Sequence, residues 1–157
     1  MQRTAHIITV SNDKAAKRAP YIYAGFALNF RALYVGETRS SQGAVGRMAQ
    51  HISETSSNTF KKRICTLLGY EEINLEGISF FAVPLSNYRG FWSDSSEYRR
   101  AVEFLVQNEM LNFLTKEEKN VLLVSRVNAN GYCNTGIVKN EAKIVARSLI
   151  HSMKHVI

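Results

Sequence analysis

The sequence predicts a single α+β domain over residues 1–157, with helices flanking a small central sheet that is partly antiparallel. Two runs of β-branched and aromatic residues, 21–26 and 32–36, are separated by a short turn and predict a hairpin, whose strands are antiparallel. Helical spacing of apolar residues begins only after this hairpin and then alternates with further strand signals. A length of 157 residues is ordinary for one domain with its own core.

The first third of the chain predicts strands followed by one amphipathic helix. Residues 5–10 form a short β-branched run that predicts a strand, and the polar segment 11–20 ends in Pro20 and predicts a loop. After the hairpin and a connection at 38–43, helical spacing predicts a helix over 43–54. We expect its buried face to hold Val45, Met48, Ala49 and Ile52, and its exposed face to hold Arg47, His51 and Glu54.

The rest of the chain predicts three more helices and two more strands. Helices are expected at about 58–68, capped by Ser56, Ser57 or Asn58 and ended by Gly69, at 96–114 with Asp94 as N-cap, and at 139–155. Strands are expected at 78–83 and 121–127. The apolar positions expected to point inward in these helices are Phe60, Ile64, Leu67, Leu68, Leu105, Val106, Met110, Leu111, Phe113, Leu114, Ile144, Val145, Leu149 and Met153.

Charge and composition narrow the class of protein. The chain has a net charge of +7, and residues 1–50 hold seven basic and two acidic residues, so most of the excess lies there. Such a surface favours a polyanion such as nucleic acid, with a merely basic protein as the alternative. No apolar run approaches the ~20 residues of a membrane helix, and no signal peptide is recognised, so no membrane role is expected. Cys65 and Cys133 lie far apart and fit reduced thiols in the cytoplasm.

Two tyrosines, followed by an arginine and a histidine on one helix, form the motif that suggests a functional site. Tyr23 and Tyr34 lie 11 residues apart on the two hairpin strands, so they can share one face of the sheet. Arg47 and His51 follow at i, i+4 spacing on one helix face. Each pair alone is ordinary packing or a solvated surface, but their order along the chain indicates a common site.

This pattern resembles the GIY-YIG nuclease family. Residues 21–23 (Tyr-Ile-Tyr) are similar to its first motif, although Tyr21 stands where glycine is usual, and residues 34–36 (Tyr-Val-Gly) are similar to its second. The Arg47/His51 pair matches the family's next helix, and Glu103 in Ala-Val-Glu-Phe resembles its metal-binding glutamate. The resemblance covers a core at residues 20–135 and leaves 136–157 as a C-terminal helical extension. Either Asn130 or Asn134 is a possible match to a late asparagine.

The resemblance implies a metal-dependent DNA endonuclease, a hydrolase of phosphodiester bonds that uses one divalent ion, Mg²⁺ or Mn²⁺. Glu103 would bind the metal, and Arg47 would bind the scissile phosphate. Tyr23 is the expected general base, with His51 as the rival because its ordinary pKa lies near 6.5. Tyr34 would orient these groups, and Gly36 would allow close backbone approach. Glu141 is a rival carboxylate, and Glu97 and Glu109 are ordinary helical acids.

The expected partner is DNA, with RNA also possible, contacted through phosphates by Arg31, Arg39, Lys61 and Lys62. A homodimer or a protein partner would supply specificity, because no separate recognition domain is apparent. Two other functions stay open. The same fold would serve as a catalytically inactive nucleic-acid-binding or regulatory module, or its basic face and tyrosines would dock a protein.

Overall fold

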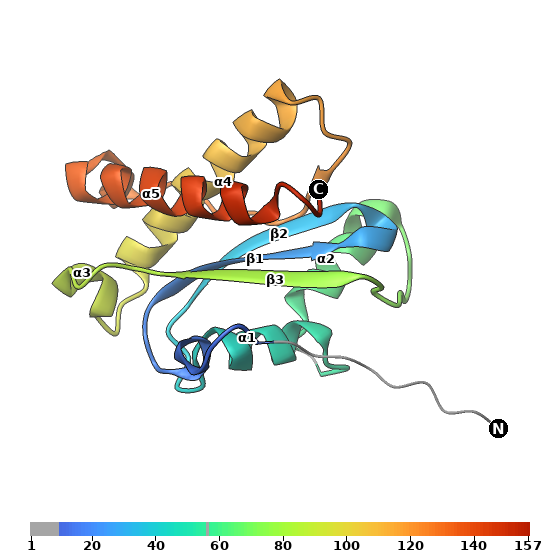
Figure 1. Ribbon diagram of the computed structural model, residues 1–157, viewed down its shortest axis with the longest axis horizontal. Helices are drawn as coiled ribbons and strands as arrows, with labels where there is room; N and C mark the ends of the chain where they lie inside the picture. The colour runs from blue at the N-terminus through green and yellow to red at the C-terminus, as the bar shows by residue number, and fades with distance from the viewer. Residues whose placement is uncertain (1–9, 56) are drawn as a thin grey trace.

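The structure is a computed structural model, and it describes residues 10–55 and 57–157. A four-stranded sheet is covered on its faces by helices, which confirms the predicted α+β class (Figure 1). The helices are α1 (Gly43–Ile52), α2 (Thr59–Leu68), α3 (Arg89–Trp92), α4 (Glu97–Lys116) and α5 (Gly136–Met153). The strands are β1 (Tyr21–Ala27), β2 (Ala32–Thr38), β3 (Ile78–Pro84) and β4 (Leu122–Leu123), and three 3₁₀ turns are η1 (Asp13–Ala16), η2 (Leu28–Phe30) and η3 (Gly131–Asn134).

The sheet is mixed, in the order β3-β1-β2-β4. β1 pairs antiparallel with β2 and with β3, so the predicted hairpin is confirmed and the sheet is partly antiparallel as expected. β4 is a short parallel strand that pairs only with the start of β2. The outer edge of β2 beyond Leu33 therefore has no neighbouring strand among the described residues. Side chains bond the backbone of β2 there instead.

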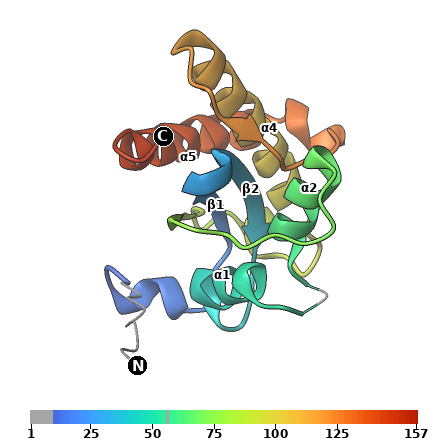
Figure 2. The same ribbon diagram turned by 90° about the vertical axis from the view of Figure 1, so that its right-hand side faces the viewer.

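Side-chain alternation along the strands creates two cores. Ile22, Ala24 and Phe26 of β1 pack with Leu33 and Val35 of β2 against α4 and α5. On the opposite face, Ala27 and Ala32 pack with Phe60 and Ile64 of α2, next to Tyr34 and Phe80. Figures 1 and 2 show α4 and α5 on one side of the strands and α1 on the other. This two-face arrangement leaves Tyr23, Tyr34 and Gly36 on the α1 side.

The helix ends follow local capping chemistry. The Asn58 side chain accepts a hydrogen bond from the Lys61 N–H and caps α2, and Gly69 ends α2 with φ of 74°, a left-handed conformation that glycine adopts without strain. The expected cap of α4 is wrong. Ser96, not Asp94, precedes the helix, and Asp94 instead forms an ion pair with Arg39.

Two predicted strands need comment. The strand expected at 121–127 is reduced to Leu122–Leu123, and the reason is that Ser125 hydrogen-bonds the Val35 N–H with its side chain rather than its backbone. The strand expected at 5–10 falls almost wholly outside the described residues, and Val10 is not in a strand. The short helix α3 lies between the strand expected at 78–83 and the helix expected at 96–114, where no element is predicted.

The predicted buried faces are partly wrong. In α1 the expected orientation is reversed for the key residue, because His51 is fully buried whereas Ile52 is 39% exposed. Leu67, Leu68, Leu111 and Ile144 are also exposed rather than inward. Leu67 and Leu68 lie in the last turn of α2, and Ile144 lies on the face of α5 away from its buried residues.

α5 packs against the sheet and α4. Its residues Val138, Ala142, Val145, Leu149 and Met153 are buried in the same core as the sheet and α4. Among the described residues, no helix has the length and apolar character needed to span a membrane.

Candidate functional site

Tyr23 and Tyr34 lie side by side on the α1 face of the hairpin. Tyr23 pairs with Gly36 and Tyr34 pairs with Gly25, so both tyrosines stand on alternate positions that share this face. Their ring centroids are 6.2 Å apart and the rings are inclined by 19°. The two phenols therefore form the stacked pair that the sequence spacing predicts.

Gly36 is the position over which the Tyr23 ring lies. A Cβ atom at residue 36 would overlap the Tyr23 hydroxyl and would come within 2.5 Å of Tyr23 Cζ and 2.9 Å of Tyr34 Cε1. No side chain fits there without moving a tyrosine. Glycine at this position thus allows the Tyr23 phenol to cross β1 and reach above β2.

His51 reaches this phenol from the last turn of α1. Its fully buried imidazole is surrounded by the rings of Tyr34, Tyr23, Phe60 and Phe80, at centroid distances of 4.9, 5.4, 6.3 and 6.4 Å. The expectation of an exposed Arg47/His51 face is therefore wrong for His51. Burial inside this aromatic cluster, reinforced by the nearby Arg47 charge, lowers the His51 pKa to about 3, so the ring is neutral.

The hydrogen bonds of His51 define its tautomer. The Phe60 backbone N–H donates to Nδ1 at 3.2 Å, so Nδ1 carries no proton. A neutral ring then has its hydrogen on Nε2, which lies 2.7 Å from the Tyr23 hydroxyl oxygen. We infer from this network that His51 donates to Tyr23 and does not accept a proton from it.

Arg47 is the second donor to the same phenol. Its Nε donates to the Tyr23 hydroxyl at 3.3 Å, and its other nitrogens donate to Gln50 Oε1 at 2.7 Å and Thr59 Oγ1 at 3.1 Å. Thr59 also hydrogen-bonds Tyr34. Sequence reasoning did not find Thr59, although its place directly after the α2 cap fixes its side chain beside α1.

Glu103 lies at the open edge of β2, close to the tyrosines. Its carboxylate accepts hydrogen bonds from the Glu37 backbone N–H and, through Oε1, from Gln107 Nε2 at 3.0 Å. Glu37 is the residue that follows Gly36, above which the Tyr23 hydroxyl lies. The phenol therefore lies over Gly36 on the α1 face of β2, whereas the Glu103 carboxylate comes from α4 on the other side and reaches the edge of the strand at the next residue.

The pKa values of these groups reflect this proximity and their burial. Burial, then the Glu37 carboxylate, raises the pKa of Glu103 to about 8, against the lowering influence of Arg100 and Arg47. Burial is the largest cause that raises the pKa of Tyr23, and the neighbouring Tyr34 raises it further. The Arg47 guanidinium lowers this pKa, and Glu103 raises it. The four groups therefore interact electrostatically as one site.

Polar side chains that were not predicted complete the edge of β2. Gln107 Nε2 donates to the Val35 carbonyl at 3.3 Å, and Ser125 accepts from the Val35 N–H at 3.0 Å. Arg99, only 5% exposed, donates to Glu37 Oε2 at 2.8 Å. Gln107 and Arg99 stand four residues either side of Glu103, so this i, i+4 polar row on α4 was the available signal.

The alternative acidic and amide residues lie elsewhere. Glu141, the rival carboxylate, accepts hydrogen bonds from the Ser86 N–H and hydroxyl and ties α5 to the end of β3. The Asn130 side chain accepts from the Tyr132 N–H and donates to the Glu97 carbonyl, so it caps η3. Asn134 is exposed at the end of η3. None of the contacts found for these residues joins them to Tyr23.

The four basic residues expected to contact phosphates do not form one cluster. Arg31 donates through Nε to the Asn120 carbonyl at 2.6 Å, and Arg39 binds Asp94 at 2.6 Å. Arg39 Nε is buried and, among the described residues, has no hydrogen-bond partner. Lys61 and Lys62 line a separate hollow of about 550 Å³ that also contains Glu54, Glu71 and Glu72. Its acidic rim is unfavourable for a phosphate backbone.

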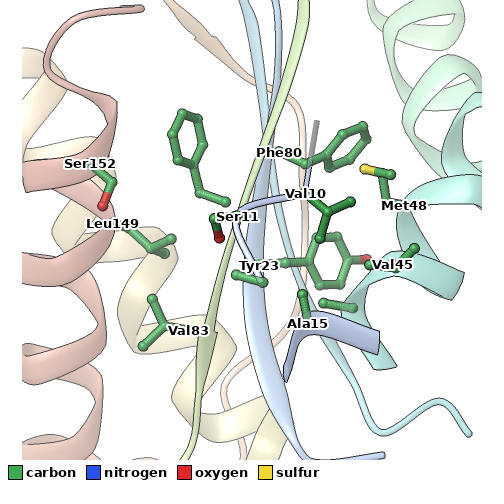
Figure 3. A pocket seen from close by; sticks show the side chains of 13 residues that line it. Val10, Ser11, Ala15, Tyr23, Val45, Met48, Phe80, Val83, Leu149 and Ser152 are labelled. Atoms are coloured by element: carbon green, nitrogen blue, oxygen red, sulfur yellow. The ribbon is translucent and has the colours of Figure 1, made fainter. Parts of the chain in front are cut away.

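A groove borders the site at the β3 side of the sheet. Its volume is about 410 Å³, and its lining includes the Tyr23 ring, Val45 and Met48 of α1, and Phe80 of β3. Figure 3 shows the Tyr23 ring pointing toward Val45 and Met48, with Leu149 and Ser152 on the far side of the strand. Tyr23 itself is only 3% exposed, so little of this residue reaches solvent through the groove.

The site offers one carboxylate that suits a divalent cation. Among residues 10–55 and 57–157, no group of three or more His, Cys, Asp or Glu side chains is arranged to hold a metal. Glu103 supplies hard oxygen donors, with Glu37 as its acidic neighbour. This donor set fits a single ion that keeps most of its coordination for water and substrate oxygen atoms.

Comparisons with known proteins identify no relative. No family model matches the chain, and no curated protein or solved structure matches it.

Proposed function

We propose that this chain is a metal-dependent endonuclease that hydrolyses phosphodiester bonds in DNA by a one-metal mechanism of the GIY-YIG type. The observation that supports the proposal is that three groups lie at neighbouring residues of β2. The Tyr23 phenol lies above Gly36, the Arg47 guanidinium bonds this phenol, and the Glu103 carboxylate binds the next residue's N–H. A guanidinium and a phenol suit an anionic phosphate, and a carboxylate beside them suits a divalent cation.

Each side chain has a role that its contacts support. Arg47 would donate to the nonbridging oxygens of the scissile phosphate, exchanging its bonds to Gln50 and Thr59 for bonds to substrate. Glu103 would hold one divalent cation, Mg²⁺ or Mn²⁺. When bound, such an ion supplies charge neutralisation at the phosphate and the departing oxygen. Tyr34 would hold the phenol in position, and Thr59 would hold the guanidinium in position.

The hydrogen-bond network favours Tyr23 over His51 as the general base. His51 Nδ1 is occupied by the Phe60 N–H, and its Nε2 carries the hydrogen that it donates to Tyr23. The Tyr23 oxygen receives donors from both His51 and Arg47, and these two bonds stabilise a phenolate. In this scheme the Tyr23 hydroxyl first loses its proton to solvent, the resulting phenolate takes the proton of the attacking water, and His51 orients the phenol oxygen.

One feature favours the second candidate, a catalytically inactive nucleic-acid-binding module on the same fold. Tyr23 is 3% exposed, and burial raises its pKa well above the ordinary value of a phenol. A base must reach water and ionise, and both requirements are opposed here. The endonuclease proposal therefore requires that substrate and metal open the hydroxyl to solvent.

A cleavage assay separates the two candidates. Purified protein is incubated with supercoiled plasmid and labelled oligonucleotides, with Mg²⁺, with Mn²⁺ and with chelator. We expect metal-dependent nicking, and we expect Tyr23→Phe, Arg47→Ala and Glu103→Gln each to lower it by at least about a hundredfold. Glu109→Gln, an exposed acid on the same helix, serves as the matched control. Salt-sensitive binding without cleavage in either metal would instead identify the inactive module.

A further inference from the structure

A second hollow, rich in tyrosine, lies where the loop before α4 meets η3. It has a volume of about 380 Å³, and its lining includes Tyr88, Tyr98, Tyr132 and Arg89, with Glu97 at its edge. The three tyrosines are half-buried, and Arg89 is exposed. The candidate site uses none of these residues.

The rings of this hollow are held in a fixed arrangement. The Tyr98 and Tyr132 centroids lie 4.0 Å apart with the rings inclined by 34°, and Tyr88 meets Tyr98 edge-on at 5.5 Å. The buried Phe91 ring supports Tyr88 from beneath at 5.2 Å. The Tyr88 and Tyr98 side chains also hydrogen-bond each other. Ordered aromatic rings that keep part of their surface in solvent are suited to stacking a planar ligand.

Arg99 joins this hollow to the candidate active site. Its guanidinium donates to the carbonyls of Phe91, Ser93 and Ser95 at 3.1, 2.6 and 3.1 Å, and its Nε binds Glu37 at 2.8 Å. Glu37 is also the residue whose N–H binds Glu103. The loop that forms one wall of the hollow is therefore fixed to β2 beside the proposed cleavage site.

Arginines lie near Glu103 and near the loop beside the hollow. Arg100, exposed on α4, acts on Glu103, whereas Arg39, Arg18 and Arg99 act on Asp94 in the loop beside the hollow. Arg39 keeps a buried Nε for which the described residues provide no acceptor. Arg39 pairs with Asp94 and Arg99 pairs with Glu37, which leaves the exposed Arg100 to complement the phosphates of a strand that runs from Glu103 to the tyrosines.

We propose that the Tyr88–Tyr98–Tyr132 hollow stacks one unpaired base of a nucleic-acid strand whose phosphate occupies the Tyr23–Glu103 site. The inference rests on the proposed function and specifies its substrate class: nucleic acid with unpaired nucleotides next to the cleavage point. A base inside a duplex has both faces covered by its neighbours, so only an unpaired base offers a free face to the tyrosines. Arg89 would pair with the phosphate of that nucleotide.

The test measures binding without cleavage. Full-length protein carrying Glu103→Gln is titrated, in chelator, into a labelled duplex with a short unpaired tail that contains 2-aminopurine, and into the same duplex with blunt ends. We expect the tailed duplex to bind about five- to a hundredfold more tightly, with quenching of the 2-aminopurine fluorescence. Equal affinity for the two duplexes, or an unquenched tail, would overturn the proposal.

Paired variants identify the tyrosines as the cause. Tyr98→Leu retains apolar volume but has no aromatic face, and we expect it to lose both the tail preference and the quenching. Tyr98→Phe retains the face and should retain both. Because a Tyr98 variant can fail to fold, a second comparison uses Arg89→Gln. Its control is Lys116→Gln, which removes one positive charge at the exposed far end of α4. Only the former should weaken tailed-duplex binding, and equal effects of these two changes would contradict the assignment.

This design keeps the two proposals distinguishable. Tail preference that depends on Tyr98, in a protein that cuts no DNA with Mg²⁺ or Mn²⁺, would support the hollow and refute the endonuclease. Metal-dependent cutting by the parent protein, with identical binding by Tyr98→Leu and Tyr98→Phe, would support the endonuclease and refute the hollow.

Discussion

Replacing Gly36 with alanine tests the geometry on which the candidate site depends. The added Cβ would overlap the Tyr23 hydroxyl and would lie 2.5 Å from Tyr23 Cζ. Carbon atoms in contact are ~3.5 Å apart, so the Tyr23 ring must move by roughly 1 Å. The ring cannot retreat freely, because Tyr34 Cε1 would lie 2.9 Å from the same Cβ.

This displacement acts on stability and on catalysis separately. Overpacking of this kind costs about 1–3 kcal/mol of unfolding free energy. In a chain of this size each kcal/mol lowers Tm by about 2–4 °C, so we expect a decrease of about 2–12 °C. A 1 Å shift also breaks the 2.7 Å contact between Tyr23 and His51 Nε2, and we expect cleavage to fall about a hundredfold.

The assay combines thermal unfolding followed by circular dichroism with cleavage of a labelled oligonucleotide. The matched control is Gly136→Ala at the start of α5, where an added Cβ meets nothing within 4 Å. We expect the control to keep the parent Tm or raise it slightly, because alanine is the better helix former. A Gly36→Ala protein with the Tm and near-ultraviolet tyrosine signal of its parent would refute the close packing of Tyr23 over β2.

Three further changes test other parts of the site. An asparagine side chain can replace the acceptor Nδ1 of His51, whereas a glutamine side chain can replace the donor Nε2 that contacts Tyr23. We therefore expect His51→Gln to retain more cleavage than His51→Asn. The opposite order would contradict the assigned tautomer. The raised pKa of Glu103, about 8 against an ordinary 4.5, means that its protonated form stabilises the fold below about pH 4.5 and that this contribution is lost as the pH rises through 8. Urea unfolding should therefore show the stability of Glu103→Gln gaining on the parent between pH 5 and 9, whereas parallel curves would show that the carboxyl is not desolvated. Arg99→Met removes the donor shared by a carboxylate and three carbonyls and should cost about 3–5 kcal/mol, against less than about 0.5 kcal/mol for exposed Arg100→Met; similar urea midpoints would refute this role.

The hairpin and its tyrosines could be predicted from sequence because their cause is local. Alternation along two strands joined by a short turn places Tyr23 and Tyr34 on one face whatever surrounds them. Register then sets Gly36 opposite Tyr23. The fold class follows from the same pattern, since a hairpin before the first helix requires an antiparallel pair in the sheet.

The side of α1 that faces the core could not be predicted in the same way. Apolar spacing favours burial of Val45, Met48 and Ile52, whereas the structure buries His51 completely. A histidine is buried without unsatisfied polar atoms when both ring nitrogens have partners, and here the partners are Tyr23 and the Phe60 N–H. Both partners come from other elements, so no local count of apolar residues reveals them.

The polar side chains at the edge of β2 could not be predicted from sequence for a similar reason. Residues 121–127 have strand composition, yet backbone pairing stops at Leu123, and Ser125 and Gln107 then bond Val35 with their side chains. This exchange of a strand for side chains opens the place that Glu103 occupies. The position of Glu103 on α4 thus depends on the early end of β4, and the spacing of residues along the chain does not predict where β4 ends.

The protonation states of the site bear on the choice between the two candidate functions. At neutral pH the lowered pKa keeps His51 uncharged and the raised pKa keeps Glu103 protonated, so the Arg47 guanidinium is the charge that remains among these groups. A cluster of buried polar groups costs stability that apolar side chains would not, and such clusters concentrate where a protein binds or reacts. A site with one uncompensated cation favours an anion such as phosphate in either candidate. Only the endonuclease also needs the Glu103 proton to leave in exchange for a metal ion. Stabilisation by Mg²⁺ that grows with pH in the parent, and is absent in Glu103→Gln, would therefore favour the endonuclease over the inactive module.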